Sequence, residues 1–173
     1  MTWFPNIEVV TDSAHIQYLR KAYEHGWNTS DDESTRNGAL IVKDGQIVLY
    51  GANGYYDYYR DIPERHQRPL KYSSVKHAER DLVTSAARKG IGLEGTTLYC
   101  PWYACDICAD EIRMAGIIRV VGHEDTYLKT PERWQGPIDK GIQMLHDAGV
   151  ITLMYRGKIG GVQAKLNYII WEP

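Results

Sequence analysis

Two short motifs near the middle of the chain constrain its fold more than any other feature: His77-x-Glu79 and Cys105-x-x-Cys108. One imidazole and two thiolates are one ligand short of the four protein ligands that a structural zinc site uses, and catalytic zinc keeps that position for water. A carboxylate beside the histidine that the metal does not need is a natural acid and base for that water. The fold must therefore bring both motifs to one place, and the pattern predicts a catalytic zinc site with Glu79 beside it.

Each half of this pattern also has an ordinary explanation. A single C-x-x-C is commonly a buried structural pair, and a single histidine is more often a surface or core residue than a ligand. Their conjunction, in this order and before helices, favours the metal. A non-catalytic module stabilised by zinc stays open, and it predicts a fourth protein ligand, His66 or His123. We expect Cys100 to be a buried strand residue without a metal role.

Length and composition limit the remaining classes. A chain of 173 residues fits a single domain over 1–173, and its formal net charge of -2 lacks the basic excess of a typical nucleic-acid binder. Three cysteines, two of them in one motif, suit a reducing compartment better than a disulfide framework. No apolar run is long enough to span a membrane, and residues 1–5 do not resemble a signal peptide. We therefore expect a cytoplasmic enzyme without a membrane partner.

The hydrophobic pattern predicts an alternation of strands and helices after an initial helix that Gly26 ends. The Asp44-Gly45 pair between two apolar runs predicts a hairpin, and a long polar, tyrosine-rich loop then extends to Ser74. The expected helices cover residues 13–26, 78–89, 105–115 and 137–148. The expected strands cover residues 39–42, 47–50, 96–100, 117–121 and 150–155. The tail, about 157–173, ends in an apolar run that must pack on the domain or on a neighbouring subunit.

This order of elements predicts an α/β domain with a mixed sheet covered by helices on both sides. Both metal motifs then lie at helix N-termini. The partial positive charge of a helix N-terminus lowers the pKa of a thiol and favours the thiolate that zinc binds.

These residues resemble the cytidine and deoxycytidylate deaminase superfamily, most closely the deoxycytidylate (dCMP) deaminases, including phage-type members. The resemblance extends from about residue 34 to residue 150. It includes T-R-N-G-A-L-I-V at 35–42, G-A-N-G at 51–54, A-G-I at 115–117, and the H-x-E and C-x-x-C motifs, which have the order found in zinc deaminases. It implies a three-layer α/β/α fold with a five-stranded mixed sheet.

The resemblance also implies roles for individual residues. Zinc would bind His77, Cys105 and Cys108, one ion per chain, and Glu79 would shuttle protons. Asn53 would contact the sugar, with a simple turn residue as its alternative. Further substrate contacts are expected from Ala78, Trp102, Tyr103, Tyr127 as the aromatic that stacks on the base, and Arg36 near a phosphate. Trp102 and Tyr127 could equally be core aromatics, and Arg36 an ordinary surface cation.

The implied reaction is the hydrolytic deamination of dCMP to dUMP with release of ammonia, which supplies the synthesis of dTMP. The resemblance further implies a homo-oligomer that dCTP activates and dTTP inhibits, with Mg²⁺ on the triphosphate, at a site that includes Gly51, Asn53 and Gly54. Alternatives are another cytosine nucleotide or a nucleic acid, as for the tRNA adenosine deaminases. A basic cluster in the long loop is either solvated or a phosphate-binding patch: Arg60, Arg65, His66, Arg68 and Lys71.

Overall fold

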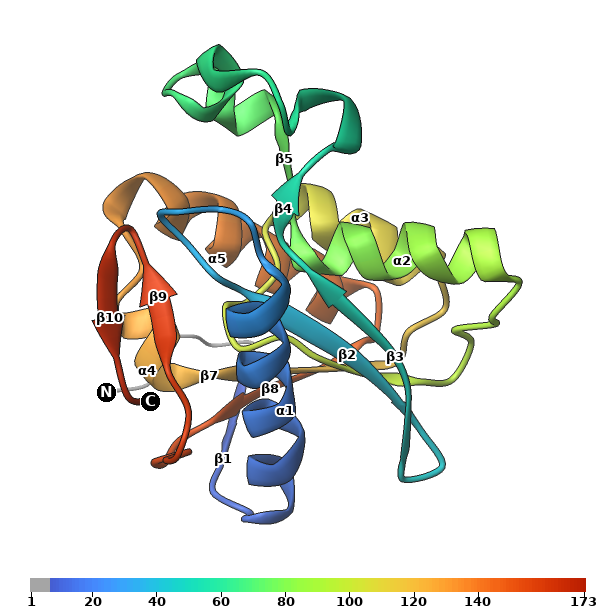
Figure 1. Ribbon diagram of the computed structural model, residues 1–173. Coiled ribbons are helices and arrows are strands. Elements are labelled where there is room, and N and C mark those ends of the chain that lie inside the picture. Colours follow the sequence, from blue (N-terminus) through green and yellow to red (C-terminus); the bar gives the residue numbers. More distant parts are fainter. Residues whose placement is uncertain (1–6) are drawn as a thin grey trace.

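A six-stranded mixed sheet lies at the centre of the computed structural model, which describes residues 7–173 (Figure 1). Residues 1–6, which include the segment that does not resemble a signal peptide, lie outside the described residues. The strand order is β1-β8-β7-β6-β2-β3, and β2 runs antiparallel to both β3 and β6 while the other neighbours are parallel. The strands are β1 (Glu8–Val10), β2 (Gly38–Lys43), β3 (Gln46–Ala52), β6 (Thr97–Tyr99), β7 (Arg119–His123) and β8 (Ile151–Tyr155).

Helices cover both faces of this sheet, as the sequence predicts. The helices are α1 (Ala14–Thr29), α2 (Ala78–Lys89), α3 (Asp106–Met114), α4 (Glu124–Leu128) and α5 (Glu132–Asp147). Successive strand residues point to opposite faces: Ile41 packs in the cluster with α2, α3 and α5, and Leu40 packs in the cluster with α1. The expected three-layer α/β/α fold is confirmed.

Five of the six strands are the expected ones, and β1 is the sixth. It is three residues long and pairs in parallel with the edge strand β8, from Glu8 beside Leu153 to Val10 beside Tyr155. A segment this short shows no alternation that could be recognised in the sequence. The predicted β2–β3 hairpin is present, and its turn has positive φ at Asp44 and Gly45, which matches the twist of the two strands.

The prediction that Gly26 ends the first helix is wrong, because α1 continues to Thr29. A Cβ on Gly26 would lie 2.4 Å from the backbone nitrogen of Gly38, and one on Gly38 would lie 2.0 Å from the carbonyl oxygen of Ala22. Gly26 is therefore a packing residue that lets α1 cross β2 backbone to backbone. This contact also brings the loop after α1 close to the end of β3, where Asn53 lies.

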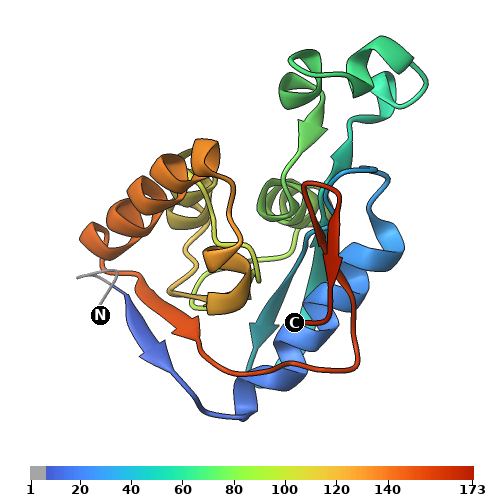
Figure 2. The same ribbon diagram turned by 90° about the vertical axis from the view of Figure 1, so that its left-hand side faces the viewer.

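The long loop before residue 75 is an arm that projects from the body of the molecule in both views (Figures 1 and 2). Its base is the antiparallel pair β4 (Gly54–Tyr55) and β5 (Val75–Lys76), and three short 3-10 turns follow one another within it. These turns are Asp57–Tyr59, Pro63–His66 and Leu70–Ser73.

The C-terminal segment forms a second small hairpin, β9 (Ala164–Leu166) with β10 (Ile169–Trp171). Ile159, Val162 and Ala164 are buried in the cluster on the α1 face. Helix α5 begins at Glu132, five residues before the predicted start at Pro137, and α4 was not expected. Within residues 7–173, no helix is both long and apolar enough to cross a membrane.

Candidate functional site

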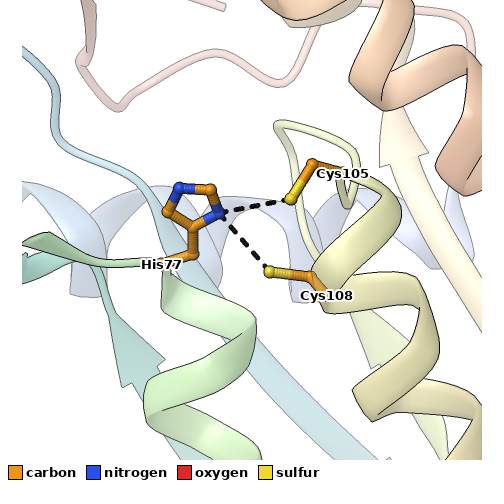
Figure 3. A group of neighbouring side chains, drawn as sticks. All are labelled: His77, Cys105 and Cys108. Atoms are coloured by element: carbon orange, nitrogen blue, oxygen red, sulfur yellow. Dashed lines mark hydrogen bonds between the residues drawn. The ribbon is translucent and has the colours of Figure 1, made fainter. Parts of the chain in front are cut away.

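His77, Cys105 and Cys108 lie together between the first turns of α2 and α3 (Figure 3). His77 Nδ1 is 3.6 Å from Cys105 Sγ and 3.4 Å from Cys108 Sγ, and the three ligand atoms lie within 4.8 Å of one another. Tetrahedral zinc with ordinary Zn–N and Zn–S bonds places nitrogen and sulfur about 3.5 Å apart. The three side chains therefore have the spacing that a tetrahedral ion requires.

Helix geometry explains why the two motifs converge. His77 is the N-cap of α2 and Cys105 is the N-cap of α3, both in extended conformation. The C-x-x-C spacing places Cys108 in the first turn of the same helix, so both sulfurs face one point. The predicted location of both motifs at helix N-termini is confirmed.

The thiols interact strongly with each other. A hydrogen bond with the Cys108 thiol lowers the pKa of Cys105 to about 4, burial opposes this shift, and the contact with His77 adds to it. The pKa of Cys108 is raised, first by the same hydrogen bond and then by burial. One thiolate is thus stable here, whereas a second negative charge beside it needs a compensating cation, which is what a divalent metal provides.

Two contacts fix the position of the helices that carry these ligands. Arg80 of α2 donates to the carboxylate of Glu111 of α3 through Nε at 2.8 Å and Nη2 at 2.6 Å. Gly141 of α5 touches the segment before α3, where a Cβ would lie 2.4 Å from Ala104 O and 2.8 Å from the carbonyl carbon of Cys105. Glycine at this position allows α5 to support the cysteine segment directly.

Glu79 lies in the first turn of α2 and is 3% exposed. Burial raises the pKa of its carboxyl group, and nearby His77 partly offsets the shift. A raised pKa makes a carboxylate a stronger base, which suits a group that accepts a proton from water and later returns it. Cys100 lies beside Glu79, and its thiol donates to the carbonyl oxygen of Trp102 at 2.8 Å. Cys100 is buried, as expected, but it lies directly after β6 and not within the strand, and it is not part of the ligand group.

Neither candidate for a fourth protein ligand lies in this group. His66 is in the arm, where its ring stacks on Tyr55 with centroids 3.9 Å apart. His123 lies at the end of β7, hydrogen-bonded to Tyr23 OH at 2.7 Å and to Gly157 O at 2.9 Å. Among residues 7–173, only three side chains form the metal-binding group. The site therefore has the ligand number of a catalytic centre.

A pocket that is open to solvent leads to this group. Most of the residues predicted from the sequence line this pocket: Asn53, His77, Ala78, Glu79, Trp102, Tyr103 and Cys105. Cys108 lies behind the wall, within the ligand group.

Asn53 is held at the pocket wall by the loop that follows α1. Its Nδ2 donates to Thr35 O at 2.9 Å and to Asp32 Oδ2 at 3.4 Å, and its Oδ1 accepts from the backbone N–H of Asn37 at 2.7 Å. Asn53 is therefore more than a turn residue, because it connects the end of β3 to this loop.

Lys71 differs from the solvated cation that the loop composition suggests. It is 8% exposed, and its Nζ donates to Asp32 Oδ1 at 2.6 Å and to Ser34 Oγ. Asp32 in turn accepts from the backbone N–H of Ser34 at 2.8 Å. This buried ion pair fixes the arm to the loop that also holds Asn53.

Two predicted contacts lie elsewhere. Tyr127 is in α4, where its hydroxyl donates to Asp139 at 2.8 Å, and it is not among the pocket-lining residues. Arg36 donates to Trp27 O at 2.7 Å, and its guanidinium lies 5.1 Å from the centre of the Trp27 ring. Neither residue therefore lines this pocket in the structure.

A further aromatic residue that lines the pocket is Trp134, with Tyr72 beside it. The Trp134 ring is edge-on to the rings of His77 and Trp102, with centroids 5.8 Å and 6.1 Å away. Trp134 lies in the first turn of α5, which the sequence pattern placed five residues later. A predicted helix start at Glu132 would have placed Trp134 in the first turn of this helix.

The glycines of the 51–54 turn have packing roles. A Cβ on Gly51 would lie 2.5 Å from Ala78 O, and one on Gly54 would lie 2.6 Å from Asp31 Oδ1. Both glycines allow close approach within the chain, which explains them without a bound triphosphate.

The chain belongs to the family described as the cytidine and deoxycytidylate deaminase zinc-binding region, whose model matches residues 12–124. It is therefore a deaminase-family protein, and its ligand group is of the kind that this family name describes.

Individual relatives make the relationship more specific. The chain is 35% identical over 123 residues to an "Uncharacterized deaminase in luxG 3'region" of Aliivibrio fischeri, covering 70% of this chain and 80% of that protein. It is 32% identical over 149 residues to the deoxycytidylate deaminase of Enterobacteria phage T4, covering 82% and 70%. The structure of dCMP deaminase from cyanophage S-TIM5 with dCMP and dUMP has a TM-score of 0.64 at 22% identity, covering 85% and 99%, which supports the fold. The predicted relation to phage-type dCMP deaminases is thus confirmed.

Proposed function

We propose that the chain catalyses the hydrolytic deamination of dCMP to dUMP with one zinc ion per chain. The observation that carries the proposal is the arrangement of three metal-binding side chains and a buried carboxylate, Glu79, at the inner end of one pocket. The relation to the phage T4 enzyme supports a cytosine nucleotide as the substrate.

Glu79 performs the proton transfers in this proposal. A zinc ion held by His77, Cys105 and Cys108 would supply the Lewis acidity that activates water. The Glu79 carboxylate accepts a proton from the attacking water as the C4–O bond forms, and gives it to N3 of cytosine. Glu79 then transfers the second water proton to the amino group, the C4–N bond breaks, and ammonia leaves. Burial of Glu79 keeps bulk water from competing for these protons.

The pocket walls would hold the rest of the nucleotide. Trp134 takes the role that the sequence analysis gave to Tyr127, because it lines the pocket beside His77. Asn53 is the proposed sugar contact, and its bonds to the loop at residues 32–37 position it for that contact.

The test is ammonia release from a panel of cytosine nucleosides and nucleotides, with Glu79→Gln as the central variant. This variant should retain zinc and its fold but lose turnover by about three orders of magnitude or more, because one group serves more than one proton transfer. Glu94→Gln, an exposed carboxylate on another loop, is the matched control. Near-normal turnover in Glu79→Gln would place the proton shuttle elsewhere. Activity confined to RNA, and sensitive to salt, would favour the nucleic-acid alternative.

Homo-oligomerisation and regulation by dCTP and dTTP with Mg²⁺ remain predictions of the family resemblance. They are tested by dCMP saturation with and without each triphosphate, combined with sedimentation. A hyperbolic curve that neither triphosphate changes, from a monomeric protein, would mean that Asn53 serves the substrate alone.

A further inference from the structure

Two arginines from distant segments meet at the outer end of the pocket. Arg68 comes from the arm and Arg133 from the first turn of α5, and both line the pocket that contains Glu79. The Arg68 guanidinium donates to Asn167 Oδ1 at 2.8 Å, and that of Arg133 donates to the same oxygen at 3.4 Å. The two guanidiniums lie at nearly equal distances from the centre of the Tyr72 ring, 6.0 Å for Arg68 and 5.9 Å for Arg133.

These two charges lack an acidic partner. Among residues 7–173, no carboxylate lies within ion-pair distance of Arg68 or Arg133, whereas Arg60 of the same arm pairs with Asp31 at 2.9 Å. Asn167, the acceptor that they share, is neutral. Two like charges held together around a neutral oxygen repel each other, and an anion between them would remove this repulsion.

The surroundings of Asn167 make this arrangement specific. It lies at the turn of the β9–β10 hairpin with φ of 51°, a left-handed conformation that asparagine tolerates. Its backbone N–H donates to Thr35 Oγ1 at 3.3 Å, and the next N–H, that of Tyr168, donates to Ser34 O at 2.8 Å. The hairpin turn is thus fastened to the loop that also holds Asn53. Its amide oxygen is presented at a fixed position at the pocket mouth.

The start of α5 adds to the positive potential. The backbone N–H of Trp134 in its first turn donates to the carbonyl oxygen of Pro131 at 2.8 Å, and the dipole of this 16-residue helix adds positive potential at the pocket rim. The other charged pair of the wall, Lys71 with Asp32, is internally neutralised. The outer end of the pocket is therefore positive, and its inner end holds the metal-binding group.

We propose that Arg68 and Arg133, positioned by Asn167, bind the 5′-phosphate of the nucleotide substrate and make the enzyme select a monophosphate over a nucleoside. This inference rests on the proposed function for the identity of the base. A phosphate monoester carries about two negative charges at neutral pH, which two guanidiniums match. Both Arg133 and Asn167 lie outside the residues that the family model matches. Arg68 and the arm lie within the matched residues, so the part of the site that lies outside them comes from α5 and the C-terminal hairpin.

The experiment compares kcat/KM for dCMP and for deoxycytidine. Arg68→Ala and Arg133→Ala should each lower the value for dCMP roughly 10- to 100-fold and leave that for deoxycytidine nearly unchanged. Arg65→Ala is the matched control, because Arg65 belongs to the same arm but packs over Tyr59, 4.5 Å from its ring centre. Asn167→Asp, which is nearly isosteric, should weaken the preference for dCMP, because the new carboxylate would pair with the two arginines and offset one of their two charges. Arg133→Lys should retain more of the preference for dCMP than Arg133→Ala but less than the unmodified protein, because the lysine ammonium is a point charge without the planar donors of arginine.

A binding measurement separates failure of this inference from failure of the proposed reaction. Calorimetry with dUMP and deoxyuridine requires no turnover, and dUMP should bind at least 10-fold more tightly to the unmodified protein. Loss of that difference in Arg68→Ala and Arg133→Ala, but not in Arg65→Ala, supports the phosphate site even if no cytosine compound is deaminated. Equal kcat/KM for dCMP and deoxycytidine, or an unchanged preference in both alanine variants, overturns it. A preference for dCTP over dCMP overturns the assignment to a monophosphate.

Discussion

Replacing Lys71 with methionine tests whether the arm is fastened to the body by a buried ion pair. The Lys71 Nζ to Asp32 Oδ1 distance is 2.6 Å, and the two side chains are 10% and 4% exposed. Removing one partner of a buried pair leaves an uncompensated charge and costs about 3–5 kcal/mol. Asp32 would still accept from the N–H groups of Ser34 and Thr35 and from Asn53 Nδ2, so we expect the lower end of this range.

Urea unfolding measures the effect directly. With an m-value of about 2 kcal/mol/M, a loss of about 3 kcal/mol lowers the midpoint by about 1.5 M. The matched control is Lys21→Met, because the Lys21–Glu24 pair has a similar distance, 2.8 Å, but side chains that are 54% and 38% exposed. An exposed pair contributes less than about 1 kcal/mol. The double variant Lys71→Met with Asp32→Asn removes both charges and should be more stable than Lys71→Met alone.

Equal and small effects of Lys71→Met and Lys21→Met would refute the reasoning, because the pair would then behave as a solvated one. A double variant less stable than Lys71→Met would also refute it, since the cost would then come from lost packing and not from the unpaired carboxylate.

Three further predictions concern the ligand group and the core. Cys105→Ser and His77→Ala should lose zinc after dialysis, whereas Cys100→Ala should keep it; stoichiometric zinc in both of the first two would disprove the ligand assignment. Gly141→Ala should push α5 away from the cysteine segment, lower the free energy of unfolding by about 1–3 kcal/mol and weaken zinc binding. The control is Gly136→Ala in the same helix, where a Cβ meets open space, and it should be neutral or stabilising by up to about 1 kcal/mol. Burial lowers the pKa of His123 below 6.5, so the unfolded chain binds the proton first and the free energy of unfolding should fall as the pH drops below 6.5. Between pH 7 and pH 5.5, His123→Gln should lose less of this free energy than the unmodified protein, and an equal loss would contradict the prediction.

Sequence patterns were sufficient where the structural relation is local. The spacing in Cys105-x-x-Cys108 places two sulfurs on the first turn of one helix, and Asp44-Gly45 encodes a hairpin turn. Both relations span only a few residues, so period and turn chemistry identify them. The alternation of strands and helices likewise determined the three-layer fold, because each amphipathic element must cover another.

Sequence patterns were insufficient where a residue's role depends on a distant partner. Glycine is the residue type typical of a helix end, yet the contact of Gly26 with Gly38 makes Gly26 a packing residue within α1. Tyr127 and Trp134 are both aromatic residues after β7, and nothing local distinguishes which of them enters the pocket. The start of α5 decides this, and tertiary packing sets that start.

The sequence by itself therefore predicted which residues lie at the inner end of the pocket, because His77, Glu79 and the two cysteines belong to short motifs at helix N-termini. Only the tertiary structure decided the outer end. Arg68, Arg133 and Asn167 come from an arm, a helix and a hairpin that are far apart in the chain. No periodicity relates such residues, and their proximity results from the packing of segments that each fold for other reasons.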